Sequence, residues 1–173
     1  MKDLLFSFEG RIRRRDYWLG LLALILVNLV LTFFVVPALV LVGGAAGYWL
    51  AVLVTYGVNL FVSAALMTKR LHDRDKPAMP WVAIFLGTPL AITVAQLLGI
   101  GFDTVTMPAG EAGTMPARPV PGSDGMVVVS MPDMLGVVLL LVALAVVLWA
   151  IVELGFLRGT VGPNRYGPDP KAQ

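Results

Sequence analysis

Residues 17–67 read YWLGLLALILVNLVLTFFVVPALVLVGGAAGYWLAVLVTYGVNLFVSAALM, a long apolar stretch without Lys, Arg, Asp or Glu. A helix that crosses the hydrocarbon core of a bilayer needs about 20 apolar residues. The stretch is therefore too long for one crossing and has the length for two. Its only segment rich in turn-forming residues is GGAAG at 43–47. We therefore expect one helix over 17–42 and a second over 47–67.

The composition of the whole chain indicates the same class of protein. Hydrophobic residues make up 58% of the 173 residues and charged residues 14%, whereas soluble domains have about 45–50% and about 25%. A soluble core of this size cannot bury so much apolar surface, and disordered chains are polar. The chain has no Cys and one His, which excludes a disulfide framework, a thiolate metal site and a multi-His metal site.

Two further apolar stretches, at 81–101 and 134–157, are also long enough to span a bilayer. The sequence therefore predicts an all-α fold, a single polytopic membrane domain over 1–173 with a four-helix transmembrane bundle. Polar side chains inside the spans, such as Asn28 and Asn59, are expected to find partners on neighbouring helices. Pro37 lacks the N–H that would bond the preceding turn, so we expect a kink near it.

The distribution of basic residues predicts the orientation of these helices. Every Lys and Arg except Arg118 lies in 1–16, 68–80 or 158–173. Positive charge favours the cytoplasmic side, so the chain is expected in a bacterial inner (plasma) membrane with both termini and the 68–80 loop in the cytoplasm. The loop 102–133 is then periplasmic, and its many Gly and Pro residues predict an irregular, mobile segment.

The N-terminal segment 1–16 has the pattern of a short interfacial helix. Leu4, Phe8 and Ile12 would share one face, with arginines on the remaining surface. Such a helix lies on anionic lipid with its apolar face in the membrane. Tyr17 then marks the level of the headgroups.

Glu153 is the one ionisable residue inside a predicted span. A carboxylate at this depth is costly unless it is paired or protonated. It lies three residues after Ala150, on the face that is expected to point inward. We expect it to pair with Arg158 or with an arginine from 11–15, while a proton or substrate site is the alternative reading.

Three motifs occupy the basic segments: FEGRIRRRDYW at 8–18, RLHD at 70–73 and GTVGPNRYGPDP at 159–170. The tail motif contains two Gly-Pro steps and a Pro-Asp-Pro run, which restrict its backbone. We therefore expect the tail to fold back onto the other two segments, although the three are far apart in sequence. If they converge, their arginines and carboxylates should be partly buried.

Together these motifs resemble the bacterial inner-membrane family known as DUF805, the YhaH/YhaI type. The resemblance rests on the Phe-x-Gly-Arg-x-x-Arg-x-x-Tyr-Trp pattern, on Arg-Leu-His-Asp, and on Gly-x-x-Gly-x-Asn-x-Tyr-Gly-x-Asp-Pro. It covers nearly the whole chain and implies an integral inner-membrane protein. It implies no particular activity.

The converging motifs define a candidate site, which is either a nest for phosphate and lipid headgroups or a structural ion-pair cluster. Its members are the charged, aromatic and amide side chains of the three motifs: Arg11, Arg14, Arg70, His72, Asp73, Asn164, Arg165 and Tyr166.

The sequence predicts a non-enzymatic membrane protein with a basic cytoplasmic face. No nucleophile motif, phosphate loop or metal cluster is present in it, and we expect no cofactor and no nucleic acid. The expected partners are the lipid bilayer, anionic lipid in particular, and a further copy of the chain or another membrane protein. Two alternatives stay open: a small transporter or channel subunit acting as an oligomer, and an interfacial phospholipid-acting enzyme with His72 as acid or base.

Overall fold

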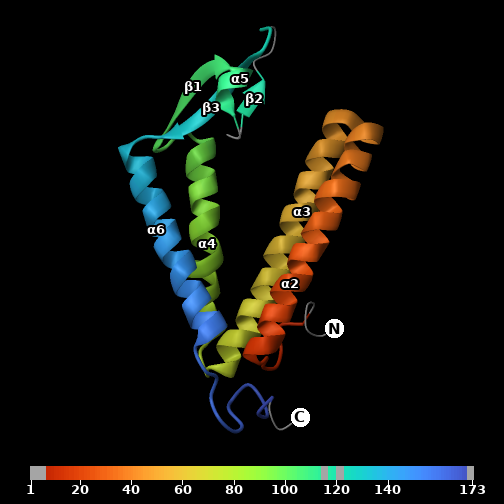
Figure 1. Ribbon diagram of the computed structural model, residues 1–173. Helices are drawn as coiled ribbons and strands as arrows, with labels where there is room; N and C mark the ends of the chain where they lie inside the picture. Colours follow the sequence, from red (N-terminus) through yellow and green to blue (C-terminus); the bar gives the residue numbers. More distant parts are fainter. Residues whose placement is uncertain (1–6, 114–116, 120–122, 171–173) are drawn as a thin grey trace. The chain divides into compact units, whose positions relative to one another are not determined.

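The computed structural model describes residues 7–113, 117–119 and 123–170 (Figure 1). The chain forms two compact units, one of Met1–Leu86 with Trp149–Gln173 and one of Gly87–Leu148. The first unit contains a helical hairpin and the segments near both ends of the chain. The second contains the middle of the chain with a small sheet.

The hairpin consists of α2 (Arg14–Val30), the π-helix η1 (Leu31–Val35) and α3 (Val36–Asp73). Helical geometry is interrupted at Gly44, whose φ of 54° and ψ of −130° are accessible to glycine. The chain reverses there, and its two arms run side by side (Figure 1). The reversal lies inside the expected turn, but the first helix begins earlier, at Arg14, and the second continues to Asp73.

Two local features shape the turn end of the hairpin. The π-helix η1 ends two residues before Pro37. The helix is therefore widened close to the position where we expected a kink. Such π-helical turns are common where the regular hydrogen-bond pattern of a helix is broken. At Gly47, a Cβ atom would lie 1.8 Å from the carbonyl oxygen of Leu39. Only glycine allows the two arms to approach so closely.

Midway along the hairpin, Asn28 and Asn59 exchange two hydrogen bonds. Nδ2 of Asn28 donates to Oδ1 of Asn59 at 2.9 Å, and Nδ2 of Asn59 donates to Oδ1 of Asn28 at 2.7 Å. Each Nδ2 also donates to the carbonyl four residues earlier, that of Leu24 or Thr55. The interhelical partner expected for these amides is therefore confirmed, and both are satisfied in apolar surroundings.

The remaining helices are α4 (Ala78–Leu97), α6 (Met134–Ala150) and the π-helix η2 (Ile151–Phe156). In the described residues, three helical segments are long and apolar enough to cross a membrane: Arg14–Asp73, Ala78–Leu97 and Met134–Phe156. The first of them contains the whole hairpin. The assembly of all four helices into one bundle stays a prediction.

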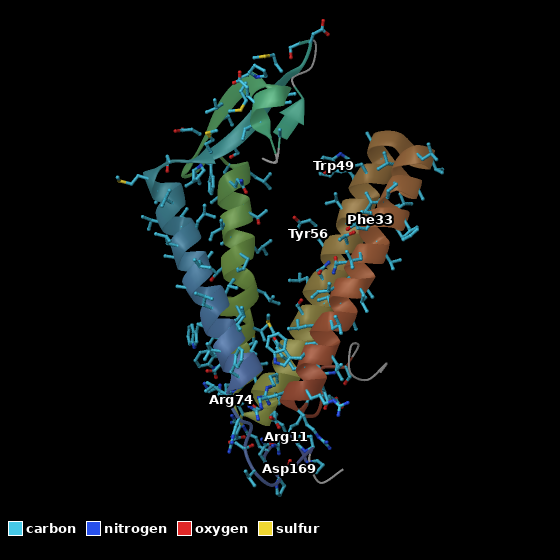
Figure 2. All side chains as sticks on the ribbon, in the orientation of Figure 1. Arg11, Phe33, Trp49, Tyr56, Arg74 and Asp169 are labelled. Atoms are coloured by element: carbon cyan, nitrogen blue, oxygen red, sulfur yellow. The ribbon has the colours of Figure 1, made fainter. Side chains whose placement is uncertain are left out.

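The outward surface of the hairpin is apolar and aromatic. Phe33, Trp49 and Tyr56 are 68%, 68% and 62% exposed, and Figure 2 labels them along its upper half. A soluble monomer rarely exposes so much contiguous apolar surface. The hairpin surface therefore has the character of one that faces lipid.

In its described residues the segment 102–133 contains a sheet, which corrects the all-α prediction and the expectation of an irregular loop. Strands β1 (Phe102–Pro108), β2 (Ala117–Pro119) and β3 (Met126–Pro132) form an antiparallel sheet in the order β1-β3-β2. A short helix, α5 (Ala109–Ala112), follows β1. The Thr and Val residues of β1 and β3 pair in register, with Val105 opposite Val129. Their β-branched side chains favour strands, a signal that the frequent Gly and Pro residues obscured.

The expected interfacial helix over 1–16 is wrong for the part that the structure describes, because residues 7–13 are not helical. Leu4, which would belong to its apolar face, lies outside the described residues. Gly10 has a φ of +84°, a left-handed conformation that ends a right-handed helix. Ile12 is buried, so this segment packs against the protein as an extended chain.

We expect Asn28→Ala and Asn59→Ala each to lower the free energy of unfolding by about 1 kcal/mol, because each leaves one half-buried amide without its partner. The double variant should cost less than the sum of the two, as measured by thermal unfolding in detergent. Thr93→Val is the control, since Thr93 Oγ1 bonds only the carbonyl of Pro89 in its own helix. Additive losses would contradict the pairing.

Candidate functional site

The guanidinium of Arg70, in the last turn of α3, is completely buried. Its Nε donates to the carbonyl of Leu154 at 2.7 Å and its Nη2 to that of Leu157 at 2.5 Å. Its Nη1 pairs with the Asp73 carboxylate and donates to the carbonyl of Ile12 at 3.4 Å. A buried charge is tolerated when it is paired and hydrogen-bonded in this way, and here it joins three separate segments.

Asp73 is shared between Arg70 and Arg11. Oδ1 of Asp73 accepts from Nη2 of Arg11 at 3.1 Å, and the two side chains are 6% and 1% exposed. Arg11 also donates to the carbonyls of Thr160 and Gly162, each at 2.8 Å, and of Gly167 at 3.3 Å. One arginine side chain therefore connects the N-terminal segment, the end of α3 and the tail.

The tail is held by further contacts with the end of α3. The backbone N–H of Thr160 donates to the carbonyl of Asp73 at 2.8 Å, and Nδ2 of Asn164 donates to the carbonyl of His72 at 2.9 Å. The rings of His72 and Tyr166 stack, with centroids 3.8 Å apart and planes 6° from parallel. We call this set of contacts around Arg70, Asp73 and Arg11, including the tail, the charged cluster.

Three more features complete the charged cluster. Arg165 pairs with Asp75 at 3.1 Å, between exposed side chains. The Nδ1 atom of His72 is buried without a hydrogen-bond partner in the described part of the chain. Gly159 lies directly against Asp73, and a Cβ atom there would be 1.8 Å from its Oδ2.

Glu153 is buried and paired, but its partners differ from those expected. It forms ion pairs with Arg74 and Lys76, whereas Arg158 is exposed. The reason is the length of α3: because it extends to Asp73, the turn after it lies beside η2. Nζ of Lys76 also lies 4.5 Å from the centre of the Trp81 ring, which adds a cation–π contact.

A pocket of about 70 Å³ lies next to the charged cluster, and we call it the arginine pocket. Arg13, Arg14 and Arg158 line it, and all three are exposed. Nη1 of Arg14 donates to the carbonyl of Phe156 at 3.0 Å, and Nε of Arg13 donates to that of Pro170. Arg158 has no hydrogen bond or ion pair with any described residue.

The structure separates the predicted site residues into two groups. Arg11, Arg70 and Asp73 lie at the centre of the charged cluster, and His72, Asn164, Arg165 and Tyr166 dock the tail. Figure 2 shows Arg11, Arg74 and Asp169 together at this end of the first unit. Three of the predicted residues line the pocket: Arg14, Arg70 and Asp73. Arg70 and Asp73 are paired with each other, whereas Arg14 has no ion pair with any described residue.

Sequence reasoning missed Arg13 and Arg158 as members of the arginine pocket. Arg13 is one of three consecutive arginines with nothing to distinguish it, and Arg158 is one of the partners that the sequence offers for Glu153, the other being an arginine from 11–15. The available signal was the position of Arg158 directly before the tail motif, which folds toward the start of α2. Among the described residues, no group of three His, Asp or Glu side chains is placed to hold a metal ion.

Comparison with known sequences agrees with this architecture. A sequence model of the family described as "Protein of unknown function (DUF805)" matches residues 5–168. This chain belongs to the DUF805 family. The match includes the first two motifs and the tail motif as far as Pro168, so the family resemblance of the motifs is confirmed.

Two curated relatives are named inner membrane protein YhaH, from Escherichia coli strain K12 and from Escherichia coli O157:H7. Each is 36% identical to this chain over 82 residues, which is 46% of this chain and 64% of the relative. The chain therefore covers less than two thirds of these relatives. No solved structure matches the chain. Together with the apolar helices, these findings identify a membrane protein of a family with inner-membrane members.

Asp73→Ala should destabilise the protein by about 3–5 kcal/mol, because it leaves the buried charge of Arg70 without its ionic partner. Arg70→Ala should also destabilise it, because Asp73 loses one of its two partners and the carbonyls of Leu154 and Leu157 lose their donor. Thermal unfolding of the purified protein in detergent measures this loss. Lys2→Ala and Lys171→Ala, at two positions outside the described residues, are the comparison variants and should leave the melting temperature unchanged. Equal and small effects in all four variants would contradict a folded cluster.

Gly159→Ala should release the tail, because its Cβ would collide with the Asp73 carboxylate. We expect faster hydrogen exchange at Thr160 and Asn164 and easier proteolysis after Arg165. Gly57→Ala is the matched control, since a Cβ there meets no atom within 4 Å. Unchanged exchange in the tail of Gly159→Ala would show that the tail does not depend on this contact.

Proposed function

We propose that this chain is a non-enzymatic bacterial inner-membrane protein whose four helices cross the bilayer as one bundle, with both termini in the cytoplasm. Its basic end binds the headgroups of anionic lipids. The asymmetry of charge supports this orientation, because every Lys and Arg except Arg118 lies in 1–16, 68–80 or 158–173.

The arginine pocket is the observation that carries the proposal. Arg11 and Arg70 are committed to Asp73, and Arg74 is committed to Glu153. In contrast, Arg13, Arg14 and Arg158 have no ion pair with any described residue, although they line one hollow. Guanidinium groups match phosphate oxygens in both geometry and charge, so an anionic group is the ligand that fits.

The surroundings of the pocket favour a lipid as the source of this anion. Nη1 of Arg14 bonds the carbonyl of Phe156, and the Phe156 ring packs against Trp18 with centroids 6.0 Å apart. Both rings are partly exposed. Aromatic rings of this kind concentrate at the level of lipid headgroups, which would bring a bound headgroup and its chains to the same place.

The two alternative functions receive less support. An enzyme with His72 and Asp73 as a catalytic pair needs the carboxylate beside the imidazole, but Asp73 is occupied by Arg11 and Arg70. A transporter that uses Glu153 as a proton site needs a carboxylate free to change its charge, but Glu153 is held by two cations.

Reporter fusions test the topology. Fusions after Gly44 and Gly113 should report a periplasmic location, because these positions lie between spans on the side poor in Lys and Arg. Fusions after Pro77 and Gln173 should report a cytoplasmic location. A periplasmic signal after Gln173 would contradict the four-span arrangement.

Native mass spectrometry of the protein extracted in mild detergent tests the binding of lipid. We expect retained anionic phospholipid on the unaltered chain and a loss of most of it in the triple variant Arg13→Gln, Arg14→Gln, Arg158→Gln. Arg15→Gln is the matched control, because Arg15 belongs to the same run of arginines but does not line the pocket. Equal retention by all variants would contradict the proposed site.

A further inference from the structure

We infer that the arginine pocket takes the terminal phosphate of a phosphomonoester, in preference to the phosphodiester of ordinary anionic phospholipids. This inference rests on the proposed function and specifies the chemical class of its ligand. A phosphomonoester has three terminal oxygens and carries between about −1.5 and −2 charges at neutral pH. A phosphodiester has two such oxygens and a single charge.

The charge of the pocket lining matches a dianion. The charged residues that line it are four arginines and two aspartates, which leaves a net charge of +2. They are Arg13, Arg14, Arg70, Arg158, Asp73 and Asp169. Arg70 is paired with Asp73, which it shares with Arg11, so the charge available to a ligand comes from the other lining residues, Arg13, Arg14, Arg158 and Asp169. A singly charged phosphodiester would leave one of the exposed positive charges without compensation.

The hydrogen-bond donors also match three oxygens. Arg13, Arg14 and Arg158 approach the pocket from two segments of the chain, the start of α2 and the start of the tail. Arg13 and Arg14 each use one nitrogen for a backbone carbonyl, and a guanidinium offers five N–H groups. Each arginine therefore retains donors for one terminal oxygen, and paired donors of this kind form strong bonds to phosphate.

The size of the pocket favours a terminal group. A water molecule needs about 10–15 Å³ of space of this kind, and the pocket has about 70 Å³, which is enough for a phosphate group. A terminal phosphate enters with a single substituent pointing out. A phosphodiester must lead two substituents out of the same opening, so fewer of its oxygens can face the arginines.

One ligand chemistry can come from two sources, a phosphomonoester lipid such as phosphatidic acid or a soluble phosphomonoester. The experiment uses the full-length chain in nanodiscs of phosphatidylcholine that contain phosphatidic acid or phosphatidylglycerol in equal amounts, with bound lipid counted by native mass spectrometry. A parallel arm adds glycerol 3-phosphate to nanodiscs of phosphatidylcholine alone.

We expect phosphatidic acid to be retained about tenfold over phosphatidylglycerol at pH 8, as an additional charge-assisted contact implies. The preference should be smaller at pH 5. A phosphomonoester gives up its second proton at about pH 6, so at pH 5 it carries mainly one negative charge, as a phosphodiester does. Arg158→Gln should reduce the preference, while Arg15→Gln should retain it. Binding of glycerol 3-phosphate would support the same chemistry with a soluble source.

Three results would overturn the inference, and they separate it from the proposed function. Equal retention of phosphatidic acid and phosphatidylglycerol, abolished in the triple arginine variant, would contradict the phosphomonoester preference and leave the lipid site intact. Retention of neither lipid, together with no binding of glycerol 3-phosphate, would contradict both. A preference that persists in the triple variant would place the selectivity outside the arginine pocket.

Discussion

The buried guanidinium of Arg70 is the contact on which the described end of the first unit depends. A fully desolvated positive charge is stable only with an anionic partner and with acceptors for its remaining N–H groups. Asp73 supplies the charge, and the carbonyls of Ile12, Leu154 and Leu157 supply the acceptors. These groups come from three segments, so satisfying one arginine requires the N-terminal segment, α3 and the end of η2 to meet.

The same requirement explains why a surface so rich in arginine can fold at all. Each buried carboxylate lies between two cations: Asp73 between Arg11 and Arg70, and Glu153 between Arg74 and Lys76. Like charges are therefore separated by opposite ones, and the tail adds backbone carbonyls as further acceptors. Arg13, Arg14 and Arg158 lie outside this arrangement and line the pocket, which is where charge is available for a ligand.

The hairpin solves a related problem in apolar surroundings. The amides of Asn28 and Asn59 satisfy each other across its two arms, and glycine at 44 and 47 permits the reversal and the close approach. Polar groups are thus paired at both places, by amides along the helices and by ions at their ends. Both uses follow from the cost of leaving a polar group unpaired away from water.

The sequence by itself determined the apolar helices, the reversal near Gly44, the family and the meeting of three motifs, because these depend on local composition, glycine chemistry and motif spacing. It failed for the sheet over 102–133, where strand pairing is non-local, and for residues 7–13, where burial of Ile12 outweighs the helical pattern. Only the tertiary structure assigned the partners of Glu153, since they depend on α3 ending at Asp73 rather than near Met67. Likewise, only the fold distinguished the arginines that hold the cluster together from Arg13, Arg14 and Arg158. The side chains are chemically identical, and the role of each depends on which carboxylates and carbonyls lie within its reach.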